Sequence, residues 1–217
     1  MHKVVLTFDD GPNIEHTPFI LDALAKYNVP GLFFVIGDRL NVPGALEIVR
    51  RASREGHLIG NHTFNHPNLT EVSREEIRSQ ILRTHDLISE FEPRRKLFRP
   101  PYGACNETVK AVAKELGYET LLWSASSKDW LPENESSAWV DIAVEEISSQ
   151  HIAVLLCHDR KHTAEHLPRL IERVRLLSNC KFVNYHRRRD FKWLVNGIGR
   201  RARSQLKRMD TRAMSKR

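Results

Sequence analysis

Short apolar runs alternate with helix-like segments along most of the chain, and this alternation constrains the fold more than any other feature of the sequence. Seven runs rich in β-branched and aromatic residues occur, at 4–8, 32–36, 57–60, 96–99, 120–123, 152–157 and 181–185. Several are almost continuously apolar, as expected of strands that are buried on both faces of a parallel sheet. The runs therefore predict seven parallel strands.

The segments between these runs have the length and periodicity of crossover helices. The expected helices are 17–27, 43–55, 73–90, 107–116, 136–149 and a last one ending near residue 177. Asn106 is an expected N-cap, Gly117 an expected helix stop, and Thr163 the expected cap of the last helix. Repeated strand–helix units over residues 1–186 predict one α/β domain with a parallel sheet or a barrel. In such a barrel, catalytic groups lie at the carboxyl ends of the strands.

Positive charge is concentrated at the end of the chain. Residues 187–217 hold twelve Lys/Arg and two Asp, whereas residues 1–186 hold 22 Lys/Arg and 25 Asp/Glu. The predicted domain is therefore slightly acidic, which argues against a basic groove for nucleic acid. We find no signal peptide, no cysteine pairing pattern and no apolar stretch long enough to span a membrane, so we expect a cytoplasmic location.

Two adjacent carboxylates follow the first run, in the sequence TFDDGP at 7–12. The side chains of neighbouring strand residues diverge, so Asp9 and Asp10 can have different partners. One carboxylate can then bind a metal while the other stays free to move a proton. The alternative is an ordinary Asp-Gly-Pro turn.

Two histidines four residues apart, His62 and His66, follow the third run. On a helical turn they would share one face and could bind one ion together with Asp10. Two histidines and one carboxylate leave coordination positions open, and such a set occurs with hydrolytic zinc or cobalt and with non-haem iron. We interpret a second pair of the same spacing, His162 and His166, as surface residues of the last helix.

Three further strand ends carry residues of the kinds that catalysis uses. Arg99, in RPPYG at 99–103, can hold a carboxylate in place, and Trp130 can form an apolar wall for an acetyl methyl. His158 is placed to act as a general acid. The alternatives are a stiff proline-rich strand exit and a core tryptophan. Cys157 suggests a cysteine nucleophile beside His158, but adjacent strand residues point to opposite faces.

Taken in order, TFDDGP, HTxxH, RPPYG, an SxxDW segment and LxxH resemble the five motifs of the polysaccharide deacetylases, which form carbohydrate esterase family 4. The resemblance extends from residue 4 to about residue 186. It implies a distorted (β/α)7 barrel, similar to a TIM barrel, in a single domain. This architecture agrees with the seven strands predicted from the apolar runs.

The resemblance implies a role for each motif. Asp9 would be the general base and Arg99 the residue that pairs with it, while the backbone N–H of Tyr102 would bind the oxyanion. His158 would be the acid. A divalent metal, zinc in the first place and cobalt or another ion as alternatives, would be bound by Asp10, His62 and His66. Contacts to the substrate are expected from Pro101, Asp129, Trp130 and Leu155.

The activity implied is metal-assisted removal of N-acetyl groups from N-acetylglucosamine-containing oligo- or polysaccharides, such as chitooligosaccharides or peptidoglycan. Two alternatives of the same fold are an O-acetyl esterase and a catalytically weak carbohydrate-binding protein. A third is an iron oxygenase that uses the same three ligands. That enzyme class would give Asp9 and His158 no role.

One position departs from the family pattern. The fourth motif usually begins with Asp, which tunes the acid histidine, and here that residue is Ser126. A carboxylate beside an imidazole raises the pKa of the imidazole, whereas a hydroxyl supplies only a neutral hydrogen bond. We therefore expect a weakened acid unless Asp129 or Asp159 compensates.

The basic segment 187–217 carries apolar residues at spacings of mostly three and four, from Phe191 to Met209. A basic amphipathic helix of this kind could rest on an anionic membrane surface. The other interpretation is that the apolar stripe packs on the barrel. Gly197 and Gly199 favour this second interpretation, because glycine weakens a helix.

Overall fold

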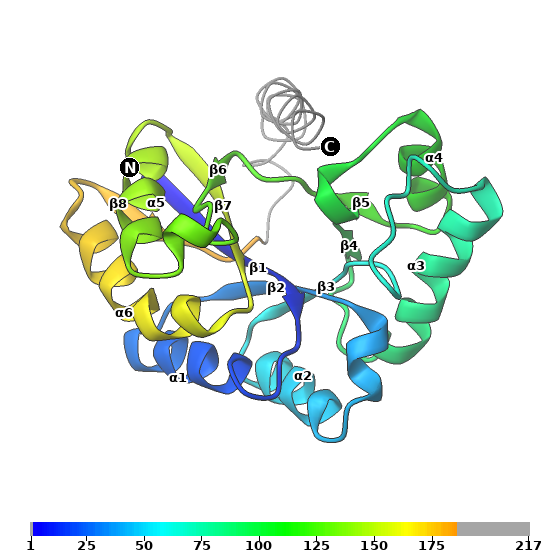
Figure 1. Cartoon of the computed structure of the whole chain (residues 1–217), viewed down its shortest axis with the longest axis horizontal. Helices are drawn as coiled ribbons and strands as arrows, with labels where there is room; N and C mark the ends of the chain where they lie inside the picture. Colours follow the sequence, from blue (N-terminus) through cyan, green and yellow to red (C-terminus); the bar gives the residue numbers. More distant parts are fainter. Residues whose placement is uncertain (1, 186–217) are drawn as a thin grey trace.

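The structure is a computed structural model and describes residues 2–185 (Figure 1). An eight-stranded sheet runs in the order β5-β4-β3-β2-β1-β7-β6, and β8 pairs with the start of β1. All of these pairs are parallel. The strands are β1 (His2–Gly11), β2 (Gly31–Val35), β3 (Leu58–Asn61), β4 (Leu97–Phe98), β5 (Glu119–Thr120), β6 (Ala125–Ser126), β7 (Ile152–His158) and β8 (Cys180–Phe182).

The sheet curls into an incomplete barrel, which confirms the predicted distorted (β/α)7 architecture (Figure 1). Its two ends are β5 and β6, and residues 121–124 run between them without strand pairing. Each of the seven predicted runs overlaps a strand. The strand that the sequence did not indicate is β6, because its two residues form no apolar run.

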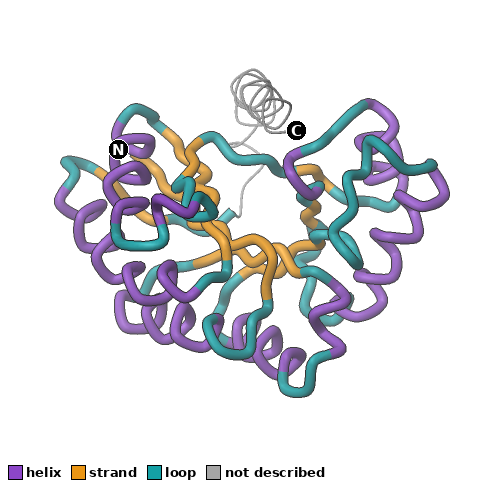
Figure 2. The backbone as a smooth tube through the Cα atoms, viewed as in Figure 1, coloured by secondary structure: helices purple, strands orange, loops and turns teal. Residues whose placement is uncertain are grey.

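Within the described residues, six α-helices cover the outside of the sheet, and the strands lie on the inside of the arc (Figure 2). They are α1 (Thr17–Tyr27), α2 (Ala45–Arg54), α3 (Arg74–Ile88), α4 (Glu107–Glu115), α5 (Ala138–Ser148) and α6 (Lys161–Leu176). Asn106 caps α4 as predicted, since its side chain accepts the N–H of Val109 at 2.9 Å. Gly117 lies just past this helix with a φ of +80°.

Side-chain alternation along the strands separates an outer core from an inner one. Along β1, Val4 and Phe8 pack against side chains of the outer helices, and these residues form the outer core. Val5 faces the other way and belongs to the core inside the curled sheet. Along β7, Leu155 packs outward and Leu156 inward. Because successive strand residues face opposite sides, this alternation also decides which polar residues reach the interior at the strand ends.

No helix within residues 2–185 is long and apolar enough to cross a membrane. The predicted amphipathic segment 187–217 lies outside the described residues. Its contact with a membrane surface stays a prediction, as does the cytoplasmic location.

Candidate active site

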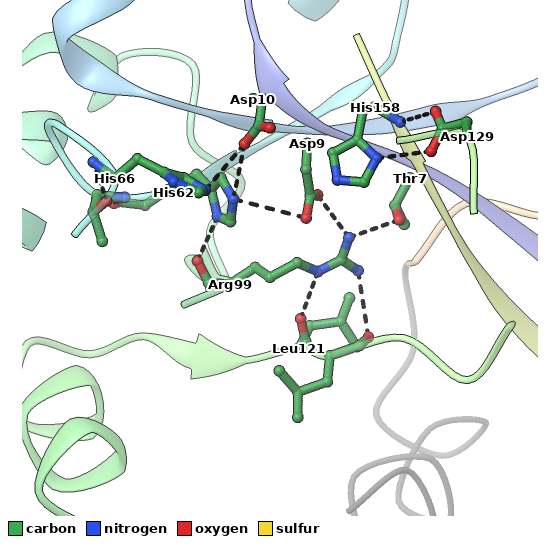
Figure 3. A network of polar contacts seen from close by, with 12 residues as sticks. Thr7, Asp9, Asp10, His62, His66, Arg99, Leu121, Asp129 and His158 are labelled. Carbon is green, nitrogen blue, oxygen red and sulfur yellow. Dashed lines mark hydrogen bonds and ion pairs between the residues drawn. The ribbon is translucent and has the colours of Figure 1, made fainter. Parts of the chain in front are cut away.

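The two carboxylates at the end of β1 diverge, as predicted (Figure 3). Asp9 continues the inward-facing row of β1 and is only 3% exposed, with its Oδ1 at 2.7 Å from Nη1 of Arg99. Asp10 has a left-handed backbone, with φ 68°, and its side chain points to His62 and His66 instead. The two neighbouring acids therefore belong to different polar groups.

Asp10, His62 and His66 offer three ligand atoms that lie within 4.8 Å of one another. Oδ1 of Asp10 is 3.4 Å from Nε2 of His62 and 3.2 Å from Nε2 of His66. The predicted convergence is confirmed, although the histidines follow β3 on an irregular loop rather than on a helical turn. Burial raises the pKa of Asp10, but hydrogen bonds to both histidines outweigh this effect and hold the pKa well below its usual range.

The orientation of His62 is set by its second ring nitrogen. Nδ1 lies 2.7 Å from the backbone carbonyl oxygen of Arg99, to which it donates. This contact leaves Nε2, which faces Asp10, as the ring nitrogen available to bind a metal ion. The donor set of two imidazole nitrogens and one carboxylate oxygen fits a divalent ion such as Zn²⁺.

Two buried amides hold the loop that carries the histidines, and the sequence analysis missed both. Gln80 of α3 is 1% exposed, and its Oε1 accepts the backbone N–H groups of Phe64 and Asn65 at 2.9 and 3.0 Å. Oδ1 of Asn61 accepts the N–H of Thr63 at 2.9 Å. A glutamine on the apolar face of a predicted helix is the signal that would have indicated Gln80, because buried amides need partners.

Arg99 is completely buried and takes its predicted position beside Asp9 (Figure 3). Its Nη1 donates to Asp9 and also to Oγ1 of Thr7 at 2.8 Å, and its Nε donates to the carbonyl oxygen of Leu121 at 3.0 Å. The guanidinium carbon lies 4.1 Å from the ring centroid of Phe34. Burial lowers the pKa of Arg99 and the charge of Asp9 opposes this shift, so the carboxylate and the guanidinium depend on each other.

His158, at the end of β7, is held by the carboxylate of Asp129. Nδ1 of His158 lies 2.8 Å from Oδ1 of Asp129, and the backbone N–H of His158 donates to Oδ2 at 2.7 Å. Burial lowers the pKa of His158, but Asp129 outweighs burial and raises the pKa above its usual value. Asp129 therefore supplies the compensating carboxylate that the sequence analysis left open. Ser126 is buried on β6, and its Oγ has no hydrogen-bond partner within the described chain.

Asp129 was expected to contact substrate, but it is not among the residues that line the cavity described below. The residue is 0% exposed, and its carboxylate accepts hydrogen bonds from the hydroxyls of Ser127 and Thr163, both at 2.9 Å. Thr163 lies inside α6 rather than at its cap. His162 was expected on the surface, but it is 8% exposed and its Nε2 donates to the carbonyl oxygen of Asp129 at 2.8 Å. The start of α6 packs against the 127–130 segment, which accounts for all three differences.

A cavity of about 190 Å³ lies over these groups. One part of its lining is polar, with Asp9, Asp10, His62, His66, His158 and Arg160. The other part is mainly apolar, with Tyr102, Trp123, Trp130 and Leu156. The cavity therefore places an apolar surface beside the ionisable groups, as binding of an acetyl methyl next to a reacting carbonyl requires.

The predicted substrate contacts are found only in part. Trp130 lines the cavity, with its ring centroid 5.2 Å from that of His158. The prediction for Leu155 is wrong by one residue, because Leu155 packs among the helices and Leu156 lines the cavity. Residues 156 and 158 face the same side of β7, as the period of a strand dictates. Pro101 is buried in a short 3-10 turn and is not part of the cavity lining.

Tyr102 lies at the rim of the cavity and is 56% exposed. Its ring centroid is 4.7 Å from that of His66, which places this residue beside the metal-ligand set. The oxyanion role expected of its backbone N–H stays a prediction.

Backbone strain is concentrated around the cavity. Within the described residues, seven non-glycine residues have positive φ, and five of them flank the site: Asp10, Thr63, His66, Tyr102 and Lys128. The other two are Asn28 and Asn179, and asparagine tolerates this region well. Each strained residue costs about 1–3 kcal/mol and persists only where surrounding contacts hold it. The clustering indicates that the strand ends are held in place for function.

Cys157 is fully buried in the outer core and does not share the cavity with His158. Burial raises the pKa of its thiol well above the usual value, which disfavours the thiolate. A cysteine nucleophile is therefore excluded by position and by ionisation, in agreement with the interpretation of the sequence.

Residues 1–121 match a family model described as polysaccharide deacetylase. A peptidoglycan-N-acetylglucosamine deacetylase of Bacillus cereus is 43% identical over 131 residues, which cover 59% of this chain and 46% of that protein. The chain thus spans less than half the length of this relative. A chitooligosaccharide deacetylase of Rhizobium leguminosarum bv. trifolii is 37% identical over 160 residues, which cover 72% of this chain and 71% of that protein.

The fold is also similar to that of a solved structure, the Bc1960 peptidoglycan N-acetylglucosamine deacetylase. The two chains share 32% sequence identity with a TM-score of 0.72, and the match covers 84% of this chain and 86% of the other.

Proposed function

The chain belongs to the polysaccharide deacetylase family, and we propose that it removes N-acetyl groups from N-acetylglucosamine-containing oligo- or polysaccharides and releases acetate. One observation carries the proposal. Three groups open onto a single cavity, namely the metal-ligand set, Asp9 backed by Arg99, and His158 backed by Asp129. Hydrolysis of an amide needs a centre that polarises the carbonyl, a base that takes a proton from water and an acid that protonates the leaving amine. These three groups can supply all three functions.

The metal would be held by Asp10, His62 and His66, with zinc as the first choice and cobalt or another divalent ion as alternatives. When bound, the ion supplies Lewis acidity, which polarises the acetyl carbonyl and makes water more acidic. The protein contributes the orientation of the ligands, because the carbonyl of Arg99 fixes His62 and the amide of Gln80 holds the loop that leads to His66.

Asp9 is the base in this proposal. Its Oδ1 is bound by Arg99, and its Oδ2 lies 3.8 Å from Nε2 of His62, on the side of the metal ligands. Oδ2 is therefore placed to take a proton from water as the water oxygen attacks the acetyl carbon. Because Arg99 fixes the other oxygen, the carboxylate does not have to reorient during the reaction.

His158 is the acid that completes the reaction. As the bond between the carbonyl carbon and nitrogen breaks, the imidazolium gives its proton to the sugar nitrogen, so the products are acetate and a free amine. An amide nitrogen is a poor leaving group without this proton. Asp129 favours the imidazolium form and fixes the ring through Nδ1, which leaves Nε2 to deliver the proton.

The acetyl group would sit with its methyl against Trp130 and Leu156, on the apolar side of the cavity. The backbone N–H of Tyr102 would add a hydrogen bond to the oxygen that becomes negative in the transition state. The same groups could cleave acetyl esters, although an ester depends less on His158 because its leaving group needs less protonation.

A catalytically weak carbohydrate-binding protein was suggested by Ser126. The carboxylate of Asp129 on His158 removes the reason for that suggestion. An iron oxygenase with the same ligands would leave Asp9 and His158 without a role. The printed names of the relatives include both peptidoglycan and chitooligosaccharide deacetylases, so both glycan classes belong in the test.

The test is acetate release from N-acetylglucosamine oligomers and from peptidoglycan fragments, with matched measurements of free amine. We expect activity that a chelator abolishes and that added Zn²⁺ restores. His62→Ala should lose both bound metal and activity. If the metal-replete chain releases no acetate from any acetylated glycan, the proposed function is wrong. Release from acetyl esters alone would favour the esterase.

A further inference from the structure

A chain of hydrogen bonds runs from the loop that carries the two histidine ligands to helix α3. It starts at Asn61, the last residue of β3, whose side chain is fully buried. Oδ1 of Asn61 accepts the N–H of Thr63 at 2.9 Å, and Oγ1 of Thr63 accepts the N–H of His66 at 3.2 Å. These two contacts connect the Asn61 side chain to a metal ligand through one intervening residue.

Thr63 depends on this support. Its φ is +70°, a region that β-branched residues rarely adopt. Such a conformation persists only where surrounding contacts hold it. The bond from the Asn61 side chain to the N–H two residues further along is one of these contacts, and it requires that the amide oxygen face Thr63. The position of His66 therefore depends on the direction of the Asn61 amide.

Two acceptors on the nitrogen side set this direction. Nδ2 of Asn61 donates to the carbonyl oxygen of Ile81 at 2.9 Å and to the phenol oxygen of Tyr118 at 3.2 Å. Both hydrogens of the amide are then used, and its oxygen is left for Thr63. A carbonyl can only accept, whereas a phenol can also donate. Tyr118 therefore fixes the amide only if its own proton is engaged elsewhere.

Glu92 engages that proton. The hydroxyl of Tyr118 donates to Oε1 of Glu92, whose side chain is 2% exposed, and Oε2 of the same carboxylate lies 2.6 Å from Nδ1 of His85 on α3. A carboxylate only accepts, so the phenol oxygen is left as an acceptor for Asn61. Burial raises the pKa of Tyr118 well above its usual value, and the hydrogen bond to Glu92 adds to this shift, so the phenol keeps its proton.

Neither Tyr118 nor Glu92 lines the cavity over the site. The ring of Tyr118 packs in an apolar cluster with residues of α3 and α4, which holds it independently of the histidine loop. We propose that Tyr118 and Glu92 are positioning residues of the metal site, which act through the amide of Asn61 on the loop between the two histidines. The inference rests on the proposed function in taking the three convergent residues as metal ligands.

The experiment removes the hydroxyl of Tyr118 with Tyr118→Phe. Hydrogen exchange of the Thr63 N–H is measured by NMR in the metal-free chain, and the Kd for Zn²⁺ is measured by competition with a chelator. Tyr185→Phe is the matched control. Tyr185 is also 5% exposed, and its hydroxyl likewise donates to a glutamate, Glu119, at 2.7 Å, but it packs in the core inside the curled sheet.

We expect Tyr118→Phe to speed exchange of the Thr63 N–H about tenfold, because a hydrogen bond that holds Asn61 is lost. The Kd for Zn²⁺ should rise roughly tenfold, as loss of an outer-shell contact does. Tyr185→Phe should lower the Tm to a similar extent and change neither quantity. An unchanged Kd for Zn²⁺ in Tyr118→Phe, or an equal change in both variants, would overturn the inference.

Glu92→Leu and Glu92→Gln test the second step. Leucine cannot accept the phenol proton, so the hydroxyl can turn toward Asn61, and the Kd for Zn²⁺ should rise as in Tyr118→Phe. Glutamine keeps an oxygen that accepts this proton and has a nitrogen that can donate to His85, so its Kd should stay near that of the unmodified chain. Equal Kd values for the two variants would overturn the role of Glu92.

Zinc binding and turnover together separate this inference from the proposed function. If the chain binds Zn²⁺ with a Kd that depends on Tyr118 but releases no acetate from any glycan, the deacetylase proposal is wrong and the positioning role stands. If acetate is released and the Kd does not depend on Tyr118, the positioning role is wrong. A chain that binds no zinc would overturn both.

Discussion

Asp129 binds His158 through both of its carboxylate oxygens, one to Nδ1 at 2.8 Å and the other to the backbone N–H at 2.7 Å. The two contacts fix the ring and the end of β7 together. In the sequence, Ser126 stands where the family usually has the aspartate that tunes the acid histidine. Asp129, three residues further along the chain, supplies that carboxylate instead.

Asp129→Asn should lower the pKa of His158. The carboxylate raises that pKa, and the acid is active only while it is protonated, so the alkaline limb of the pH–rate profile should move to lower pH. Each pKa unit lost reduces the protonated fraction about tenfold at pH values above both pKa values. The profile of kcat against pH measures the shift.

Ser126→Ala is the control for this measurement. The Oγ of Ser126 makes no hydrogen bond within the described residues, so the alkaline limb should stay where it is. A limb that moves in Ser126→Ala and not in Asp129→Asn would show that the assignment of the carboxylate is mistaken.

Asp9→Asn should keep the metal and lose the activity. Asp9 is not one of the three convergent ligands, so zinc content measured after dialysis should stay near that of the unmodified chain. Loss of proton transfer should reduce kcat by about 10²–10⁴-fold. The free energy of unfolding should also fall by about 3–5 kcal/mol, because the buried Arg99 loses its counter-charge.

Asp22→Asn serves as the matched control for Asp9→Asn. It removes a carboxylate that is exposed and paired with Arg51 on the helical surface, so neither turnover nor zinc content should change. Near-normal turnover of Asp9→Asn at full zinc content would contradict the role of this residue as base.

The strand ends could be located from the sequence because each motif follows an apolar run. That reasoning predicted the divergence of Asp9 and Asp10 and the approach of His62 and His66, and both are found. The short strand β6 could not be located, because two residues carry no periodic signal. Its place in the sheet comes from pairing with β7, which is a tertiary interaction.

The parts of the site that the sequence did not indicate depend on packing between distant segments. Asp129 reaches His158 because the start of α6 closes over the 127–130 segment, with Thr163 as a further donor. Leu155 was chosen over Leu156 by motif spacing, whereas the inward direction follows from alternation with His158. Applying that alternation along β7 would have selected Leu156 from the sequence alone.

Leu156→Ala should allow the chain to accept a larger acyl group than acetyl. Leu156 lines the cavity, so its truncation should favour an N-propionyl over an N-acetyl substrate by roughly tenfold relative to the unmodified chain, within the range that one methylene contributes. The ratio of the two kcat/KM values measures this change.

Leu155→Ala is the matched control, since it truncates the same side chain one residue earlier on the opposite face of β7. It should lower the free energy of unfolding by about 2–5 kcal/mol and leave the acyl preference as it was. If both variants change the preference equally, the inward assignment of Leu156 is incorrect.

Gln80→Leu tests whether α3 positions the metal ligands from a distance. The amide oxygen of Gln80 accepts two backbone N–H groups of the loop that leads to His66, and leucine fills similar space without an acceptor. The loop should then lose its fixed geometry, and the Kd for Zn²⁺, measured by competition with a chelator, should rise about 10–100-fold, as loss of an outer-shell contact typically does. At saturating zinc much of kcat should return, because Gln80 does not line the cavity.

Glu76→Gln is the control, because it alters the partner of the Gln80 side-chain nitrogen at 2.7 Å but leaves both loop contacts in place. Gln80→Leu with a lower Tm and an unchanged Kd for Zn²⁺ would mean that the glutamine supports the fold alone and does not position His66.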